Sequence, residues 1–158
     1  MPASPPVERY FEDYPPGAVL ECGRVAVSEA EIVAFAAQFD PQPFHVDPAA
    51  ARATHFGGVI ASGWHTGGLM MRMLAEHFLS PASSLGSPGV DELRWPRPVR
   101  PGDVLSLRVT VTAARRSASK PDRGLVHSLI EVLNQQREVV MSMRAMNLLR
   151  CREPAAGG

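Results

Sequence analysis

The spacing of apolar residues predicts a helix near the N-terminus and a rigid corner after it. Between residues 28 and 39 the apolar positions recur every three or four residues, as on one face of a helix: Ile32, Val33, Phe35, Ala36 and Phe39. Ser28 and Glu31 have the spacing of a capping box at its start. The prolines that follow disfavour helical geometry in the residues before them, so we expect a rigid, extended corner from Asp40 to Val46.

A second, longer helix is predicted from about Gly63 to Leu79, where the chain is apolar nearly all round. Its strong polar interruptions are Arg72, Glu76 and two histidines, and a helix with so little polar surface is usually buried. Its methionine-rich part fits a core better than a cofactor site: Met70, Met71, Met73 and Leu74. Asp47 followed by Pro48 has the pattern of an N-cap, which predicts a short helical turn at residues 49–53.

The second half of the chain alternates apolar and polar residues, as half-buried strands do. Four strands are expected there, at residues 90–95, 103–114, 124–134 and 139–149, and one more at residues 18–27. Turn-forming residues separate them. One strand, then helices, then a run of antiparallel strands predicts an α+β domain whose sheet covers the long apolar helix.

Composition fits one globular domain. The chain has 158 residues, 45% of them hydrophobic, and its 16 basic and 16 acidic residues cancel. A neutral chain argues against a protein that binds nucleic acid through counterion release. The charge is nevertheless unevenly placed: residues 1–93 hold eleven acids and four arginines, and residues 94–158 hold five acids and twelve bases, so the two parts carry about −7 and +7.

The ends of the chain and the cysteines give expectations about domain limits and location. We expect residues 1–9 and 151–158 to be flexible segments around a single domain at residues 10–150. Cys22 and Cys151 have neither zinc nor disulfide spacing. The N-terminal residues lack the pattern of a signal peptide, and no apolar run is long enough to cross a membrane, which predicts a cytoplasmic protein with reduced thiols.

The segment from Asp40 to His45 is the most informative one chemically. A carboxylate and an imidazole stand five residues apart across two prolines, so a stiff backbone can hold their geometry at little entropic cost. Such a pair can act as general acid and base on a water molecule. The alternative is a structural role, in which Asp40 caps a turn and His45 fills the corner, and spacing alone favours that alternative.

The start of the long helix, at Gly63, is a second candidate. Free N–H groups and the helix dipole can stabilise negative charge there on a carbonyl oxygen. Tight packing at Gly63 and ordinary capping by Ser62 explain the same residues equally well. No phosphate-binding loop or dinucleotide motif is present, so no cofactor is expected. Metal binding is not expected either, because no ligand spacing is matched by the loose set of His45, Asp47, His55 and His65.

Taken in order, these residues resemble the MaoC-like dehydratases, the hot-dog-fold group that includes the (R)-specific enoyl-CoA hydratases. The resemblance covers most of the chain and rests on four stretches: residues 10–17, 28–45, 57–63 and 93–103. It implies a single hot-dog domain in which Asp40 and His45 activate water for addition to a trans-2-enoyl-CoA, giving a 3-hydroxyacyl-CoA. It also implies that the Gly63 N–H stabilises the enolate oxygen.

Two positions depart from the family pattern. The family usually has Asn in D-x-N-P-x-H, where this chain has Gln42, and many members have His-Gly at the helix start, where this chain has Ser62 and Gly63. The reaction class is unaffected, and the acyl chain of the substrate is left open. Two other functions remain open: an acyl-CoA thioesterase, in which a carboxylate also activates water, and a subunit that binds an acyl thioester without turnover.

The resemblance also implies partners. Hot-dog domains work as dimers whose sheets join edge to edge, so we expect a homodimer or a dimer of dimers with the acyl chain at the interface. The expected ligand is an acyl-CoA, and neither nucleic acid nor a membrane is expected as a partner. The phosphates of coenzyme A have candidate partners among the arginines of the second half: Arg94, Arg97, Arg100, Arg115, Arg116 and Arg123.

Overall fold

A single antiparallel sheet forms the body of the protein. The computed structural model describes residues 8–154. The strands are β1 (Val19–Ala26), β2 (Val90–Arg94), β3 (Val104–Arg116), β4 (Arg123–Leu133) and β5 (Val139–Arg150). They lie in the order β1-β3-β4-β5-β2, and every neighbouring pair is antiparallel. The predicted α+β class is confirmed, and each expected strand is present within a few residues of its expected limits.

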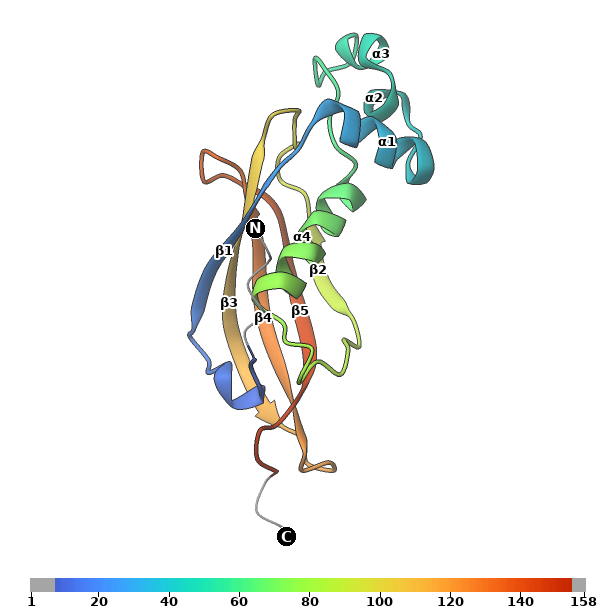
Figure 1. Ribbon diagram of the computed structural model, residues 1–158. Helices are drawn as coiled ribbons and strands as arrows, with labels where there is room; N and C mark the ends of the chain where they lie inside the picture. The colour runs from blue at the N-terminus through green and yellow to red at the C-terminus, as the bar shows by residue number, and fades with distance from the viewer. Residues whose placement is uncertain (1–7, 155–158) are drawn as a thin grey trace.

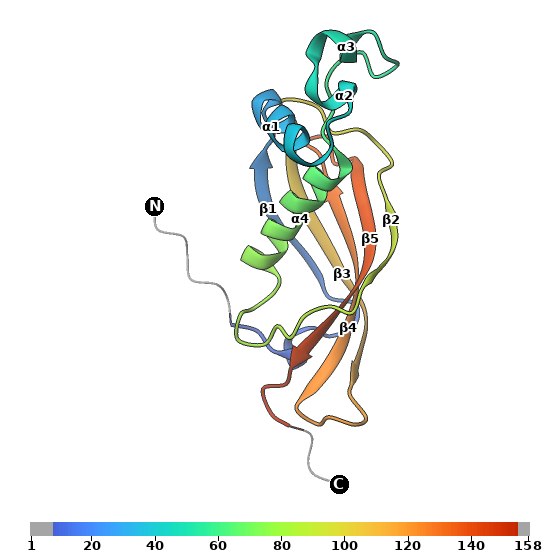
Figure 2. The same ribbon diagram turned by 90° about the vertical axis from the view of Figure 1, so that its right-hand side faces the viewer.

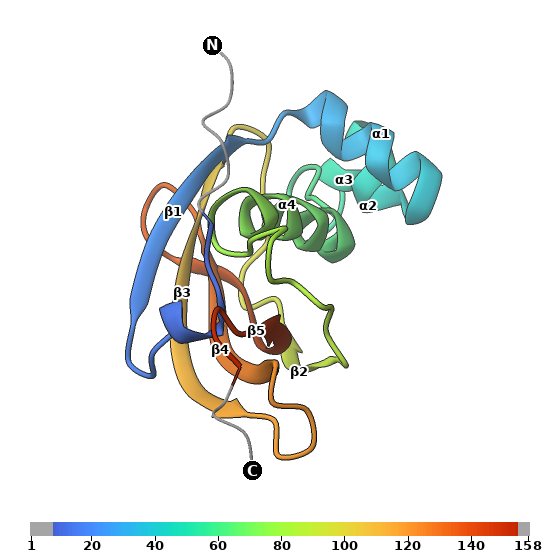
Figure 3. The same cartoon turned by 60° about the horizontal axis from the view of Figure 1, so that its bottom comes forward.

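The helices divide into one that the sheet surrounds and three that lie beyond the sheet. They are α1 (Glu29–Phe39), α2 (Pro43–Val46), α3 (Pro48–Arg52) and α4 (Gly63–His77), with a short 3-10 turn, η1, at Phe11–Asp13. The sheet curls around α4 (Figure 3), which is the hot-dog arrangement. Helices α1 to α3 extend past one end of the sheet, next to the start of α4 (Figure 1; Figure 2).

The core lies between α4 and the concave face of the sheet. Met70, Met73 and Leu74 of α4 are buried, as predicted. They belong to one apolar cluster with the inward residues of β3, which alternate along the strand as expected: Leu105, Leu107, Val109 and Val111. Gly23 of β1 has a φ of +80° and lies against α4, where a Cβ would stand 2.6 Å from the Met73 sulfur. Glycine therefore permits both the bulge in β1 and its close approach to the helix.

The corner after α1 is not extended throughout, so that prediction is wrong in part. Residues Pro43–Val46 form the helical turn α2. Pro43 occupies its first turn, where the fixed φ of proline suits a helix and its missing N–H is not needed. Gln42, immediately before it, keeps the extended geometry that a following proline requires, with φ −79° and ψ 144°.

Helix α4 is less buried than its composition predicts. Trp64 is 61% exposed and Met71 is 45% exposed, and both lie on the flank that the sheet and α1 leave uncovered. The buried residues of α4 are His65, Thr66, Met70, Met73 and Leu74. Helix α4 therefore has one flank with apolar side chains open to solvent.

Residues 8–9 and 151–154 belong to the end segments that were expected to be flexible, and both stretches contact the domain. Arg9 donates to the carbonyls of His77 and Phe78 at the end of α4. Arg152 forms an ion pair with Asp13. The rest of the expected end segments, residues 1–7 and 155–158, lies outside the described residues. Among residues 8–154, no helix is both long and apolar enough to span a membrane.

Folding brings arginines of the basic second part of the chain next to carboxylates of the acidic first part. Three ion pairs join an arginine of the basic second part to a carboxylate of the acidic first part: Arg137 with Glu21, Arg144 with Glu92, and Arg152 with Asp13. Such exposed pairs contribute little to stability, typically below about 1 kcal/mol each. They do show that several arginines already face carboxylates of their own chain.

Candidate active site

Asp40, His45 and Gly63 line one pocket. It has a volume of about 470 Å³ and lies where α1, α2 and the start of α4 meet the segment after β2. Its other lining residues are mostly apolar or aromatic: Phe56, Ile60, Ala61, Trp64, Thr66, Trp95, Pro96, Arg97, Pro98 and Val99. The three residues singled out in the sequence are therefore brought together, although Gly63 is eighteen residues from His45.

The imidazole of His45 is held from both sides. It is only 5% exposed, on α2. Its Nδ1 lies 2.7 Å from the carbonyl oxygen of Ile60. Because a carbonyl only accepts hydrogen bonds, this contact assigns the proton to Nδ1. The other ring nitrogen, Nε2, then points at Asp40, 3.2 Å from its Oδ2.

Asp40 sits just beyond the end of α1, and its carboxylate receives hydrogen bonds. The Gln42 amide donates to Oδ1 over 2.6 Å. This bond, with a weaker contribution from the Ser62 hydroxyl and the nearby His45, holds the pKa of Asp40 below its ordinary value despite some desolvation. Asp40 is thus ionised at neutral pH. Oδ2 of Asp40 and Nε2 of His45 thus lie next to each other, and both residues line the pocket, where a water molecule could contact the two polar groups at once.

The surroundings of Gly63 are compatible with both of the roles that its sequence context left open. It is the first residue of α4, after the N-cap Ser62. Within the part of the chain that the structure describes, no hydrogen bond engages its N–H, so this donor is available at the positive end of the helix dipole. A Cβ at this position would also lie 2.5 Å from Cε2 of Trp95, so only glycine fits beneath the indole.

Trp95 is a site residue that the sequence did not indicate. Its Nε1 donates to the Gly63 carbonyl over 3.1 Å, and its ring meets Trp64 edge to face at 5.3 Å. Together the two tryptophans form a wall of the pocket. Nothing in the local sequence showed that a residue after β2 would lie over the start of α4, because the contact depends on the long connection between them.

The remaining histidines of the loose set lie apart from the pair. His55 is exposed and packs on Phe56. His65 is buried and stacks on Phe35 of α1 with the rings 4.8 Å apart. Its Nδ1 has no hydrogen-bond partner among the residues that the structure describes. Asp47 accepts from the N–H groups of Ala49 and Ala50, which confirms its predicted role as a cap. In residues 8–154 no cluster of three or more His, Cys, Asp or Glu side chains could hold a metal ion.

His65 leads to a prediction about pH and stability. Burial lowers its pKa below the ordinary 6.5, and the Glu31 carboxylate partly opposes this. The unfolded chain then binds a proton here more readily than the folded chain, so the free energy of unfolding falls as the pH drops through and below 6.5. Chemical denaturation on both sides of that pH should show the loss in the wild type and a smaller loss in His65→Phe. An equal loss in both proteins would contradict it.

One family and several known proteins resemble this chain over most of its length. The family model described as MaoC like domain matches residues 13–131. The crystal structure of the MaoC-like dehydratase from Rhodospirillum rubrum is 41% identical and superposes with a TM-score of 0.86, covering 92% of this chain and 99% of that chain. The unliganded R-hydratase PhaJ1 from Pseudomonas aeruginosa is 26% identical, with a TM-score of 0.72 over 94% and 96% of the two chains.

A third relative has a named substrate class. The 3-hydroxybutyryl-CoA dehydratase of Methylorubrum extorquens is 33% identical over 103 residues, which are 65% of this chain and 63% of that protein. This chain therefore matches somewhat less than two thirds of that relative. All three similarities are to dehydratases or hydratases, and the family match includes the pocket residues from α1 to the segment after β2.

Proposed function

This chain belongs to the family of MaoC-like domains, and we propose that it is an acyl-thioester hydratase that adds water reversibly to a trans-2-enoyl-CoA. The observation that carries the proposal is the pairing of Asp40 Oδ2 with His45 Nε2, 3.2 Å apart. They share a pocket with the N–H of Gly63, which has no partner among residues 8–154. The first two can activate water, and the third can stabilise an oxyanion. The hydratases and dehydratases among the similar proteins support this reaction class.

In the proposed reaction, the oxygen of water bonds to the β-carbon while one of its protons passes to the Asp40–His45 pair. The electrons of the carbon–carbon double bond move towards the thioester carbonyl and give an enolate, whose oxygen accepts a hydrogen bond from the Gly63 N–H. The enolate then takes a proton from the pair at its α-carbon, on the same side, and the carbonyl is restored. Dehydration is the reverse sequence.

The pocket lining supports a thioester substrate with an apolar acyl group. Phe56, Ile60 and Val99 contribute apolar surface. Of the six candidate arginines, Arg97 is the one that lines this pocket, where it also pairs with Glu138 at 3.0 Å. It is the best placed of them for an anionic part of coenzyme A. The protein's own groups supply each step, so coenzyme A enters only as part of the substrate.

Exposed apolar groups around the pocket support the proposed homodimer. Among the strands of residues 8–154, β2 lies at one edge of the sheet and pairs with β5 alone. Val90 in β2 and Trp95 just after it are 48% and 40% exposed, and the uncovered flank of α4 adds Trp64 and Met71. A second copy meeting this edge would extend the sheet and cover those side chains, together with one side of the pocket.

The test of the proposed function is an assay with crotonyl-CoA, the enoyl thioester with four acyl carbons, as in the substrate of the Methylorubrum relative. We expect the enoyl absorbance to fall as water adds, and to reappear from 3-hydroxybutyryl-CoA. Release of free thiol from a saturated acyl-CoA, without hydration, would instead identify a thioesterase. Saturable binding with no turnover in either direction would identify a binding subunit.

A further inference from the structure

Gln42 is fixed more firmly than an exposed glutamine usually is. It stands between Pro41 and Pro43, and its backbone N–H donates to the Asp40 carbonyl over 2.8 Å. Its own carbonyl accepts from the N–H groups of His45, at 2.9 Å, and Val46, at 3.2 Å. The backbone of this residue is thus tied to both members of the Asp40–His45 pair, and the two prolines restrict any adjustment.

The side chain of Gln42 acts on one oxygen of Asp40. Its amide nitrogen donates to Oδ1 over 2.6 Å, and the other oxygen, Oδ2, lies beside Nε2 of His45. A carboxylate can rotate about its Cβ–Cγ bond, because terminal torsions of this kind are broad. A donor at Oδ1 limits that rotation and leaves Oδ2 facing the imidazole and the pocket.

We propose that Gln42 is a positioning residue of the reaction, whose amide sets the orientation of the Asp40 carboxylate so that Oδ2 stays beside His45. This inference rests on the proposed hydratase function. It also explains why glutamine matters at the position where the D-x-N-P-x-H pattern has asparagine. Asparagine is one methylene shorter, so on the same restrained backbone it cannot place its amide at the same point. Gln42 is therefore not interchangeable with asparagine in this chain.

Replacement of Gln42 by leucine tests this role, because leucine has a similar size and no donor. We expect kcat for crotonyl-CoA to fall about tenfold with KM changed by less than about twofold, the pattern of a group that matters more in the transition state than in binding. Gln42→Asn should show a smaller loss in the same direction. The matched control is Gln38→Leu, an exposed glutamine on α1, which should keep the kcat of the wild type.

A titration separates positioning from a merely structural role. Carbon NMR of the Asp40 carboxyl should show a higher pKa in Gln42→Leu than in the wild type, since a donor to the charged form is lost. Gln42→Glu keeps the shape but adds a like charge, so it should raise the Asp40 pKa further and move the acidic limb of the activity to higher pH.

The outcomes distinguish this inference from the proposed function. Equal kcat and equal Asp40 pKa in Gln42→Leu, Gln38→Leu and the wild type, with all three folded by thermal melting, would overturn the role of Gln42. A wild type without hydratase activity would instead overturn the proposed function. The Asp40 titration would still report in that case whether Gln42 controls the carboxylate.

Discussion

Replacement of Asp40 by asparagine is expected to lower kcat for the hydration of crotonyl-CoA by about 10²–10⁴-fold, the range typical of a lost general acid or base. Asparagine keeps the size of the side chain and an oxygen for the Gln42 amide, but it cannot accept a proton. Replacement of His45 by glutamine should have an effect of the same order, because the imidazole contacts both the Ile60 carbonyl and Asp40. Steady-state rates from enoyl absorbance measure both effects.

The two losses should not add. Asp40 and His45 are expected to act on one water molecule as a unit, so the double variant should be about as inactive as the more damaged single variant. Asp47→Asn is the matched control: asparagine caps a helix as well as aspartate does, and Asp47 caps α3. We expect wild-type kcat for this control. Full activity in both Asp40→Asn and His45→Gln would remove the basis of the proposed mechanism.

Replacement of Gly63 by alanine should damage both the fold and the reaction. The new methyl group would stand 2.5 Å from Trp95 Cε2 and 2.8 Å from its Cζ2, so the indole must move. Such overpacking typically costs about 1–3 kcal/mol of stability. Because Trp95 also bonds the Gly63 carbonyl, its displacement should disturb the start of α4 and lower kcat. Denaturant midpoints and crotonyl-CoA rates measure the two effects.

A double variant separates crowding from chemistry at Gly63. In a Trp95→Val background the indole is absent, and Gly63→Ala should then cost little stability, because alanine suits a helix better than glycine by about 1 kcal/mol. Gly67→Ala in wild type is the control, since its Cβ would meet only the Met141 methyl at an ordinary 3.7 Å; we expect no loss of stability there. The same loss with and without Trp95 would show that crowding by the indole is not the cause.

The sequence was sufficient for most of the elements, and Asp40 and His45 were singled out only with the help of the family resemblance. Periodic apolar positions indicated α1, α4 and the five strands, because all of them contribute side chains to the same core, although β2 contributes only the partly buried Leu93. The spacing across two prolines made a paired role possible, and the resemblance to the family motif favoured it over a purely structural role. The prediction of an extended corner was wrong at α2, because a proline can also begin a helical turn. The sequence alone did not decide whether Pro43 would continue an extended segment or start a helix.

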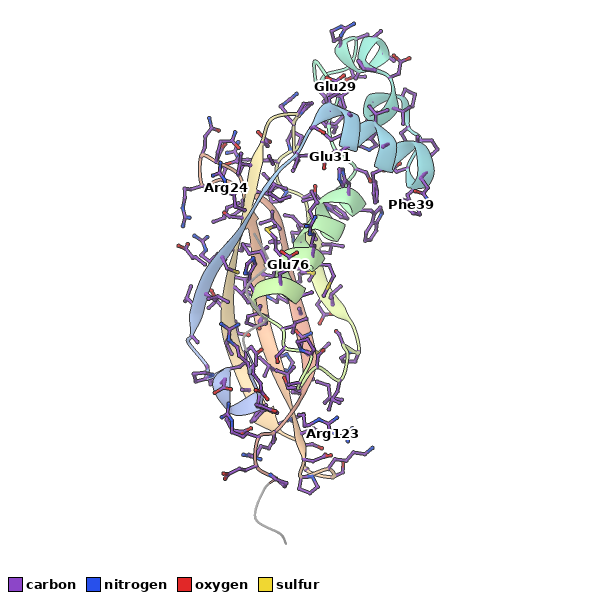
Figure 4. All side chains as sticks on the ribbon, viewed as in Figure 1. Arg24, Glu29, Glu31, Phe39, Glu76 and Arg123 are labelled. Carbon is purple, nitrogen blue, oxygen red and sulfur yellow. The ribbon has the colours of Figure 1, made fainter. Side chains whose placement is uncertain are left out.

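Long-range contacts account for what the sequence did not indicate. Phe39 belongs to the apolar stripe from which α1 was predicted, so its side chain was expected to be buried. It is instead 64% exposed, at the outer end of the helix (Figure 4). The Ile60 carbonyl that orients His45, and the Trp95 ring that covers Gly63, depend on how distant segments meet. The ion pairs that mix the two charged parts of the chain are likewise visible only after folding.

The central claim is that Asp40 and His45 add water to the double bond of an enoyl thioester. Mass analysis of the products formed from crotonyl-CoA in heavy-oxygen water tests it most directly. The account predicts 3-hydroxybutyryl-CoA that carries the heavy oxygen on its hydroxyl and retains an intact thioester, formed by the wild type and not by the Asp40→Asn/His45→Gln double variant. Heavy oxygen found in a free carboxylate, or equal product from the double variant, would contradict it.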